Sequence, residues 1–300
     1  MRTYQVYQVD SFTTEKFKGN PAGVVLNADG LSEQQMLSIA RELNNSETAF
    51  VFSPQDADHD LHIRYFTPTV EVPICGHATI ATHYVRAIVN NAVSSKVLHK
   101  VGIGILPVEI IKDEKGYLIM MTQGEIKFSD PFIGREHHNI AAALGLNQED
   151  LDQRCPIQIV STGHSKVMIG IKSRKKLDSL APDMVSLSRL SKLIGCNGYF
   201  VFTLDSEIPE ILTHGRMFAP AIGIAEDPVT GNANGPLGAY LVKHNLVKYN
   251  ECFFSFKGEQ GAAIGRSGIV EVQVKIEKGK PVEVKIGGRA VIAFQTTIEL

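Results

Sequence analysis

The stretch Pro73-Ile-Cys-Gly-His-Ala-Thr79 joins a proline, a thiol, a glycine and an imidazole at the start of an apolar run. Apolar residues then recur at helical spacing, at Ala78, Ala81, Val85 and Ile88. This spacing predicts a helix that begins near His77. The first N–H groups of a helix lack partners within it and carry partial positive charge, so this helix start offers a place for a carboxylate or another anion.

The chain contains this motif twice. The second copy is Pro228-Val-Thr-Gly-Asn-Ala233, in which proline, glycine and alanine keep their places. Thr230 stands where the first copy has Cys75, and Asn232 stands where it has His77. The match predicts a second helix start of the same kind.

Two further blocks repeat in the same order. Arg64-Tyr-Phe-Thr-Pro68 matches Arg216-Met-Phe-Ala-Pro220, and Ser46–Phe52 matches Cys196–Phe202 more faintly, with Asn197 opposite Glu47. The second copy has three extra residues between the arginine and the motif's first proline, an insertion that we expect to carry Glu226 and Asp227. A repeat of half the chain length indicates a duplicated domain.

Length and composition agree with two globular domains. The chain has 300 residues, of which 44% are hydrophobic, and domains of about 150 residues are common. We expect a first domain at residues 1–124, joined by a last strand at 289–300, and a second domain at 125–288. The formal net charge of −2 favours neither a nucleic-acid partner nor a membrane surface.

Metal and cofactor motifs are missing from the sequence. The four cysteines form no CxxC pair and the ten histidines form no HExxH, so we expect no metal site. The segment Gly102–Pro107 lacks the third glycine of a dinucleotide fingerprint, and no P-loop occurs, so we expect no cofactor. Free cysteines and the lack of a signal peptide or a long apolar span favour a cytoplasmic location.

The hydrophobic pattern predicts many short strands and two helices in each half. Expected strands are Tyr4–Phe12, Thr48–Phe52, His62–Phe66, Val97–Ile111, Tyr117–Thr122, Ile157–Ser161, Cys252–Lys257, Ile269–Ile276, Val282–Ile286 and Ala290–Thr296. A capping box at Ser32 and Gln35 starts a helix, another is expected at Glu136–Leu144, and the basic run Lys172–Lys176 is expected to be a solvated loop.

The helix after each repeated motif is apolar on all sides, which is typical of a buried helix. We therefore predict an α+β fold with two pseudo-symmetric lobes, each a β-barrel-like rolled sheet around a central helix. Gly124 and Gly287-Gly288 each separate the two final strands of a half.

Four residues are candidates for chemistry, and each has a simpler explanation. Glu47 lies just before an apolar strand, where it is either a functional carboxylate or a solvated surface group. His77 is a site imidazole or a helix cap, and Asp227 is a site carboxylate or part of an ordinary Asp-Pro turn. Cys75 is a thiol activated by the helix start or a small buried hydrophobic residue.

Together these motifs resemble the PhzF-like family of phenazine-biosynthesis isomerases, which shares the diaminopimelate epimerase fold. The resemblance covers essentially the whole chain. The motifs that carry it are Gly19–Gly23, Asn45–Phe50, Arg64–Thr79, Glu226–Ala233 and Gly258–Arg266.

The resemblance implies a cofactor-independent isomerase that acts on a small carboxylic acid in a cleft between the lobes, and a possible homodimer. It also implies that the last strand of each half crosses to the other lobe, so that Ala290–Thr296 pairs within the first. It implies that Glu47 transfers the proton and that His77 and Asp227 assist. Substrate contacts are implied at Asn20, Ser46, Gly76, Gly231 and Asn232. Many family members have serine where this chain has Asn232.

Two other functions stay open at this point. Epimerases of this fold use two thiols, one in each motif, and here Thr230 replaces the second. An amino-acid epimerase that uses Cys75 is one alternative, and a non-enzymatic protein that binds small acids is the other. A single carboxylate that moves a proton along one face of the substrate is the simplest hypothesis.

Overall fold

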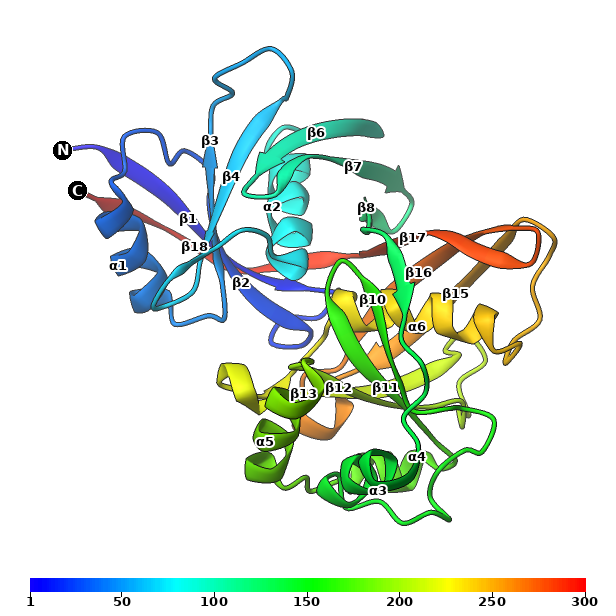
Figure 1. The fold of residues 1–300 in the computed structure, drawn as a ribbon. Coiled ribbons are helices and arrows are strands. Elements are labelled where there is room, and N and C mark those ends of the chain that lie inside the picture. Colours follow the sequence, from blue (N-terminus) through cyan, green and yellow to red (C-terminus); the bar gives the residue numbers. More distant parts are fainter. The chain divides into compact units, whose positions relative to one another are not determined.

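The computed structural model describes all 300 residues and divides into two compact units (Figure 1). Unit one comprises Met1–Thr122 with Gly287–Leu300, and unit two comprises Gln123–Ile286. We propose that these units are the two domains expected from the sequence, with each boundary two residues earlier than expected. None of the helices is both long and apolar enough to cross a lipid bilayer.

Unit one is a mostly antiparallel sheet around one helix. Its strands are β1 (Thr3–Ser11), β2 (Asn20–Val25), β3 (Thr48–Phe52), β4 (Leu61–Phe66), β5 (Glu71–Val72), β6 (Ser95–Val101), β7 (Gly104–Asp113), β8 (Gly116–Thr122) and β18 (Ala290–Glu299). The spatial order is β18-β1-β2-β3-β4-β6-β7-β8, with β5 paired to β4. The helices are α1 (Glu33–Leu43) and the central α2 (Gly76–Val89).

Unit two repeats this plan. Its strands are β9 (Ile126–Phe128), β10 (Gln158–Thr162), β11 (Ser165–Ile171), β12 (Tyr199–Thr203), β13 (Thr213–Ala219), β14 (Ile224–Asp227), β15 (Phe253–Gln260), β16 (Gly268–Glu277) and β17 (Lys280–Gly288), the last of which runs into unit one. Its helices are α3 (Gly134–Ala143), α4 (Arg174–Asp178), α5 (Met184–Ile194) and the central α6 (Gly231–Lys243), with 3-10 turns at Pro220–Ile222 and Ala262–Ile264.

The two units share one topology, strand for strand. The order β9-β10-β11-β12-β13-β15-β16-β17 in unit two corresponds to β18-β1-β2-β3-β4-β6-β7-β8 in unit one. In both, the third and fourth strands pair in parallel, as do the fifth and sixth. The predicted fold class is confirmed, although each sheet is rolled and open rather than closed into a barrel.

The first strand in the sheet order of unit one comes from the C-terminal end of the chain. Strand β18 pairs with β1 from Thr3↔Glu299 to Ser11↔Ala290, with one bulge. Strand β9 pairs with β10 in unit two. The predicted placement of Ala290–Thr296 in the first lobe is therefore confirmed.

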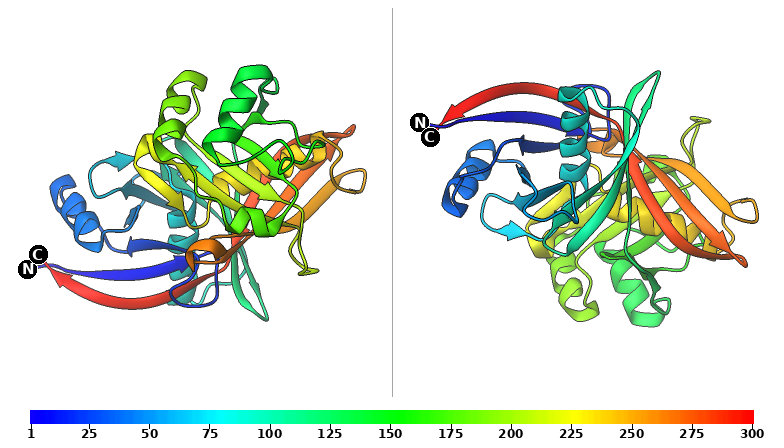
Figure 2. Two further views of the ribbon diagram at one scale, coloured as in Figure 1. Left: turned by 90° about the horizontal axis from the view of Figure 1, so that it is seen from below. Right: turned by 90° about the horizontal axis from the view of Figure 1, so that it is seen from above.

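The central helices are buried as their composition predicts. Helix α2 begins at Gly76 and contacts β1, β2, β8 and β18 (Figure 2), and α6 contacts β10, β11, β15 and β16. Ala78, Ala81 and Val85 are fully buried, but Ile88 is 44% exposed because it lies in the last turn, where the helix leaves the sheet.

Three expectations about local structure are wrong. The segment Val97–Ile111 is a hairpin of β6 and β7 rather than one strand, because Gly104 takes a positive φ of 127° and turns the chain. Unit two has four helices rather than two, since Asp183 caps the unexpected α5. The basic run is no solvated loop, because Ser173 caps the short helix α4 within it.

The same arginine–glutamate pair occurs in both units and locates the insertion. Arg64 donates to Glu71 at 2.7 and 2.6 Å, and Arg216 donates to Glu226 at 2.9 and 2.7 Å. Each glutamate lies two residues before the motif's first proline. Glu226 is thus the counterpart of Glu71 and lies outside the insertion, contrary to expectation.

The extra residues of the second copy are placed upstream instead. They lie among Ala221–Ala225, which include the rest of the 3-10 turn Pro220–Ile222 and the start of β14. Asp227 is therefore the counterpart of Val72. A carboxylate in unit two occupies a position that holds an apolar side chain in unit one.

Candidate active site

The start of α2 carries the first half of the candidate site. Cys75 is the N-cap residue in extended conformation, and its side chain makes no capping hydrogen bond. The first N–H groups of α2, from Gly76 onward, therefore lack the usual side-chain cap. This end of the helix favours negative charge.

Glu47, Ser46 and Cys75 meet around the imidazole of His77. Glu47 Oε2 lies 3.4 Å from His77 Nε2, and Ser46 Oγ lies 3.2 Å from the same nitrogen. Cys75 Sγ lies 3.4 Å from Nδ1. The Glu47 side chain is 19% exposed and that of His77 is 10% exposed, so the carboxylate is partly shielded but reachable.

Buried hydrogen bonds fix this helix start in place. Ser11 Oγ donates to the backbone oxygen of His77 at 2.7 Å, and Thr79 Oγ1 donates to that of Cys75 at 2.7 Å. The Tyr65 hydroxyl lies 2.6 Å from Thr79 Oγ1. Strand β1 and strand β4 thus both position the loop that carries the imidazole.

Asn20 lies beside this half of the site. It opens β2, where it pairs with Ser11 of β1, and it is almost completely buried. Ser11 also donates a hydrogen bond to the backbone oxygen of His77, so the residue that pairs with Asn20 contacts the start of α2 directly. A contact between Asn20 and substrate stays a prediction.

The start of α6 carries the second half. Thr230 is its N-cap residue and makes no side-chain cap; its hydroxyl donates instead to Asp227 Oδ2. Gln260 of β15 accepts from the backbone N–H of Thr230 at 3.0 Å and donates to the backbone oxygen of Asp227 at 2.8 Å. The carboxylate of Asp227 is therefore held beside the uncapped start of α6, at Gly231.

Asn232 is held by a separate chain of hydrogen bonds. Gln123 Nε2 donates to Asn232 Oδ1 at 2.9 Å, and Thr162 Oγ1 donates to Gln123 Oε1. The carbonyl oxygen of Asn232 is thus used within the unit. Nothing in the sequence singled out Gln123 as a residue that holds Asn232, and Gln260 was part of the motif Gly258–Arg266 with no role of its own.

The structural counterpart of Glu47 is Gly198, not Asn197. The N–H of Gly23 on β2 donates to the backbone oxygen of Glu47 at 3.3 Å. The N–H of Val167 on β11 donates in the same way to that of Gly198 at 2.8 Å. Both acceptors immediately precede the next strand, so the faint sequence match is one residue out of register.

Two side-chain groups could hold a metal ion. The ligand atoms of Glu47, Cys75 and His77 all lie within 4.8 Å of one another, and carboxylate, thiolate and imidazole are ligands that zinc accepts. Asp56, Asp58 and His59 form a second group, of which the two aspartates are exposed. The first group coincides with the candidate site, and the absence of a metal stays a prediction.

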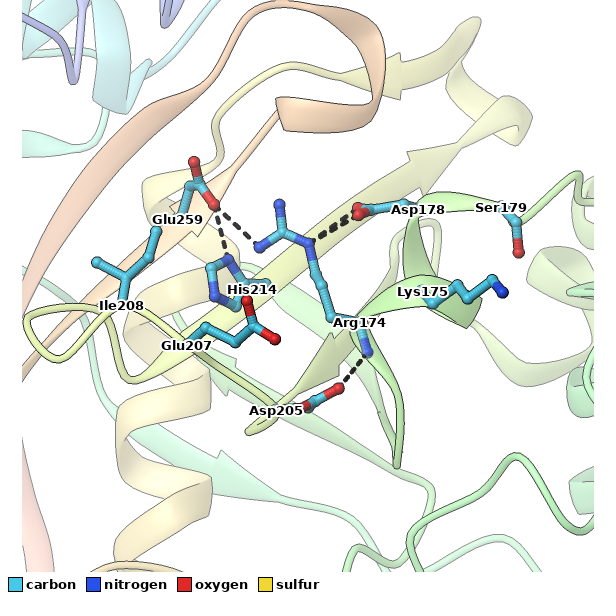
Figure 3. A pocket seen from close by; sticks show the side chains of 9 residues that line it. All are labelled: Arg174, Lys175, Asp178, Ser179, Asp205, Glu207, Ile208, His214 and Glu259. Atoms are coloured by element: carbon cyan, nitrogen blue, oxygen red, sulfur yellow. Dashed lines mark hydrogen bonds and ion pairs between the residues drawn. The ribbon is translucent and has the colours of Figure 1, made fainter.

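A separate hollow of about 770 Å³ lies on unit two, against α4 (Figure 3). Three of its charged side chains, Arg174, Asp178 and Glu259, form ion pairs, and Glu259 also contacts His214. His214 Nδ1 lies 2.7 Å from Glu259, Arg174 donates to the same carboxylate at 3.0 Å, and Arg174 also pairs with Asp178 at 2.9 Å. The pair between Arg174 and Glu259 ties α4 to β15, while Lys172 and Lys175 of the basic run are exposed.

The comparisons with known proteins agree with the fold and the motifs. The family model described as phenazine biosynthesis-like protein matches residues 9–296. The chain therefore belongs to the phenazine biosynthesis-like (PhzF) family, whose named members are isomerases.

Three relatives show how far the likeness extends. An uncharacterized isomerase of Clostridium acetobutylicum is 60% identical, over 100% of this chain and 99% of its own. The crystal structure of a PhzF-family phenazine biosynthesis protein from Bacillus anthracis has a TM-score of 0.90 and 32% identity, with 100% of both chains covered. Trans-2,3-dihydro-3-hydroxyanthranilate isomerase of Pseudomonas chlororaphis is 30% identical over 97% of this chain and 98% of its own. The chain is thus placed among isomerases.

Proposed function

We propose that the protein moves a proton between two carbons of a small carboxylic acid without a cofactor, and that Glu47 carries the proton. The observation behind this proposal is the 3.4 Å separation between the Glu47 carboxylate and the His77 imidazole at the uncapped start of α2. A base must lie where it can reach substrate, and Glu47 is 19% exposed.

In the proposed reaction, a carbon–hydrogen bond next to an unsaturated or carboxyl-bearing carbon breaks, and its proton passes to Glu47. The electron pair enters the conjugated system and leaves an enolate-like intermediate. The protonated Glu47 then returns the proton to another carbon on the same face, and the double bond moves. Atoms and charge balance without any further reactant.

The protein's own groups would stabilise the intermediate. Glu47 Oε2 lies 3.4 Å from His77 Nε2, and Ser46 Oγ lies 3.2 Å from the same nitrogen, so His77 and Ser46 orient the carboxylate. The uncapped N–H groups at the start of α2 favour the negative charge that develops on the substrate. We assign Asp227, held by Thr230, a tuning and orienting role.

One observation favours a second candidate. Cys75 Sγ lies 3.4 Å from His77 Nδ1, so the imidazole could take the thiol proton. A Cys75-dependent epimerase would use this pair. Thr230 in the corresponding place of α6 has no thiol, which counts against the two-thiol mechanism.

The test is proton exchange in D₂O, followed by NMR. The first compound is trans-2,3-dihydro-3-hydroxyanthranilate, which named relatives isomerise, followed by other small unsaturated acids. Glu47→Gln keeps the side-chain shape but cannot accept the proton, so we expect the rate to fall by about 10²–10⁴-fold.

Cys75→Ala is the matched variant that separates the two mechanisms. Under the Glu47 mechanism it keeps the rate within about tenfold, whereas a thiol-dependent epimerase loses its activity. Near-full activity of Glu47→Gln on an identified substrate would refute the assignment of Glu47. Binding of these acids without any exchange by the unmodified protein would favour a binding protein.

A further inference from the structure

A pair of side-chain amides lies next to the segment of unit one that carries Glu47. Gln8 Nε2 of β1 donates to Asn45 Oδ1 at 2.7 Å, and Asn45 Nδ2 donates to Gln8 Oε1 at 2.8 Å. The two bonds close a ring, so each amide fixes the orientation of the other. Asn45 is buried and Gln8 is half-buried, so breaking the pair would leave polar groups without water.

This amide pair holds the connection between α1 and β3. Helix α1 ends at Asn44, whose left-handed φ of 52° turns the chain away from the helix axis. Asn45 follows, and the next two residues contact the His77 ring: Ser46 Oγ at 3.2 Å and Glu47 Oε2 at 3.4 Å. The amide pair therefore ties to β1 the short segment on which both contacts depend.

The backbone alone holds Glu47 less firmly than it holds the counterpart in unit two. The N–H of Gly23 donates to the backbone oxygen of Glu47 at 3.3 Å, which is longer than the usual range of about 2.7–3.2 Å. The corresponding bond from Val167 to Gly198 is 2.8 Å long. The side-chain pair thus supplies a second fixed point where the backbone bond is long.

The strand pairings identify the counterpart of Gln8 in unit two. Gly23 and Val167 are equivalent, since each donates to the residue that precedes the next strand. Gln8 lies opposite Gly23, and Ile159 lies opposite Val167. An apolar side chain in unit two therefore takes the place of the first amide.

The second amide is also missing from unit two. Cys196 lies two residues before Gly198, as Asn45 lies two residues before Glu47. A thiol has neither the two donors nor the carbonyl oxygen of an amide, so no reciprocal pair can form there. The unit that lacks the carboxylate thus also lacks the amide pair.

The space beside the missing carboxylate is filled in unit two. Lys166 directly precedes Val167, as Ala22 directly precedes Gly23, so Lys166 is the counterpart of Ala22. A Cβ atom on Gly198 would lie 2.4 Å from Lys166 Cδ. The lysine would have to move before any side chain could stand at the counterpart of Glu47.

We propose that Gln8 and Asn45 are positioning residues that fix the Glu47 carboxylate beside His77. The inference rests on the proposed function, because it names the groups that hold the proton carrier in place. A misplacement of about 1 Å in a reacting group can lower a rate about 10²-fold. A reactive side chain on a connecting segment therefore needs support from hydrogen bonds behind it.

The test replaces the amides by side chains of similar size that form no hydrogen bonds. The double variant Gln8→Met/Asn45→Leu leaves no amide unpaired and copies the apolar character of unit two. Gln35→Met is the control, because Gln35 also uses its amide oxygen in unit one, where it accepts from the N–H of Ser32 at 2.9 Å. The single variant Gln8→Asn, whose amide arm is one methylene group shorter, gives the same test if the double variant does not fold.

Crystal structures provide a measurement that needs no substrate. In the unmodified protein and in Gln35→Met, we expect Glu47 Oε2 to stay near its 3.4 Å separation from His77 Nε2. In the double variant we expect the separation to grow by about 1 Å or more, or the carboxylate to occupy several conformers. An unchanged separation in the double variant overturns the positioning assignment.

Proton exchange in D₂O with trans-2,3-dihydro-3-hydroxyanthranilate then separates kcat from KM. We expect the double variant to lower kcat by about 10–100-fold and to change KM by less than about threefold, because neither amide needs to touch the substrate. A purely structural role would lower the thermal midpoint without this split, and an equal loss of kcat in Gln35→Met also overturns the assignment. A displaced carboxylate with an unchanged kcat would leave the positioning assignment standing and instead refute Glu47 as the proton carrier.

Discussion

A buried histidine pair makes unit one sensitive to acid. His83 of α2 and His99 of β6 are completely buried, and Nε2 of the first lies 2.9 Å from Nδ1 of the second. The remaining ring nitrogens, His83 Nδ1 and His99 Nε2, have no hydrogen-bond partner. Burial, with a smaller effect of the Arg86 charge, lowers the pKa of His99 to about 4. Burial, followed by the charges of His99 and Arg86, lowers the pKa of His83 well below its usual 6.5.

The sign of the effect follows from the lowered pKa values. Between pH 6.5 and about 4 the unfolded chain binds a proton at His99 that the folded chain does not. Stability is therefore full above pH 6.5 and falls as the pH decreases. For His99 alone, a shift from 6.5 to about 4 corresponds to about 2 kcal/mol at pH ~5 and about 3 kcal/mol once both states are protonated. His83 acts in the same direction.

The assay is urea unfolding at pH ~7.5 and ~5, followed by circular dichroism. The variant His83→Leu/His99→Leu removes both titrating groups and both unpaired nitrogens, so we expect its stability to change by about 2 kcal/mol less between the two pH values than that of the unmodified protein. His138→Leu, at an exposed position, is the control and should keep the full difference. An equal pH dependence in the double variant and the unmodified protein would refute the reasoning.

Two further predictions concern unit two and its repeat. The side chains of Arg216 and Glu226 are 9% and 11% exposed, whereas those of Arg64 and Glu71 are 25% and 38% exposed. In urea unfolding, Glu226→Ala should therefore lower the free energy of unfolding by about 3 kcal/mol and Glu71→Ala by under about 1 kcal/mol. Equal losses would contradict this ranking. Asp227→Asn can still accept the Thr230 hydroxyl and should lower proton exchange by about tenfold at most. A loss as large as that of Glu47→Gln would give Asp227 a direct part in proton transfer.

The sequence predicted the helix starts well because their signals are local. A proline, a glycine and an apolar helical stripe lie within a few residues, and both helices begin at the motif's glycine. The capping box at Ser32 is likewise confirmed. The placement of Ala290–Thr296 beside the first strand followed from the family resemblance rather than from the strand's own residues, and its pairing with β1 is confirmed.

The errors arose where position depends on pairing across the sheet. The one-residue slip that put Asn197 opposite Glu47 cannot be detected from composition, because both segments are equally apolar; the hydrogen bonds of Gly23 and Val167 correct it. The insertion was assigned too far downstream, although the sequence has a glutamate two residues before the proline in both copies. The pairing of Arg64 with Glu71 and of Arg216 with Glu226 shows that these glutamates correspond. Whether Glu47, His77 and Asp227 converge on one substrate stays a prediction.

The exchange of Ala22 and Glu47 for Lys166 and Gly198 explains how a duplicated fold can support a one-sided reaction. Two identical half-sites would present the same group to both faces of a substrate, which suits an epimerase with a thiol on each side. Here only unit one has a carboxylate at this position, because Gly198 is the counterpart of Glu47 in unit two and the Lys166 side chain lies over it. Under the proposed function a single group therefore both takes and returns the proton. A proton removed by Glu47 would return to the same face of the substrate, and a second, opposed acid or thiol is not needed.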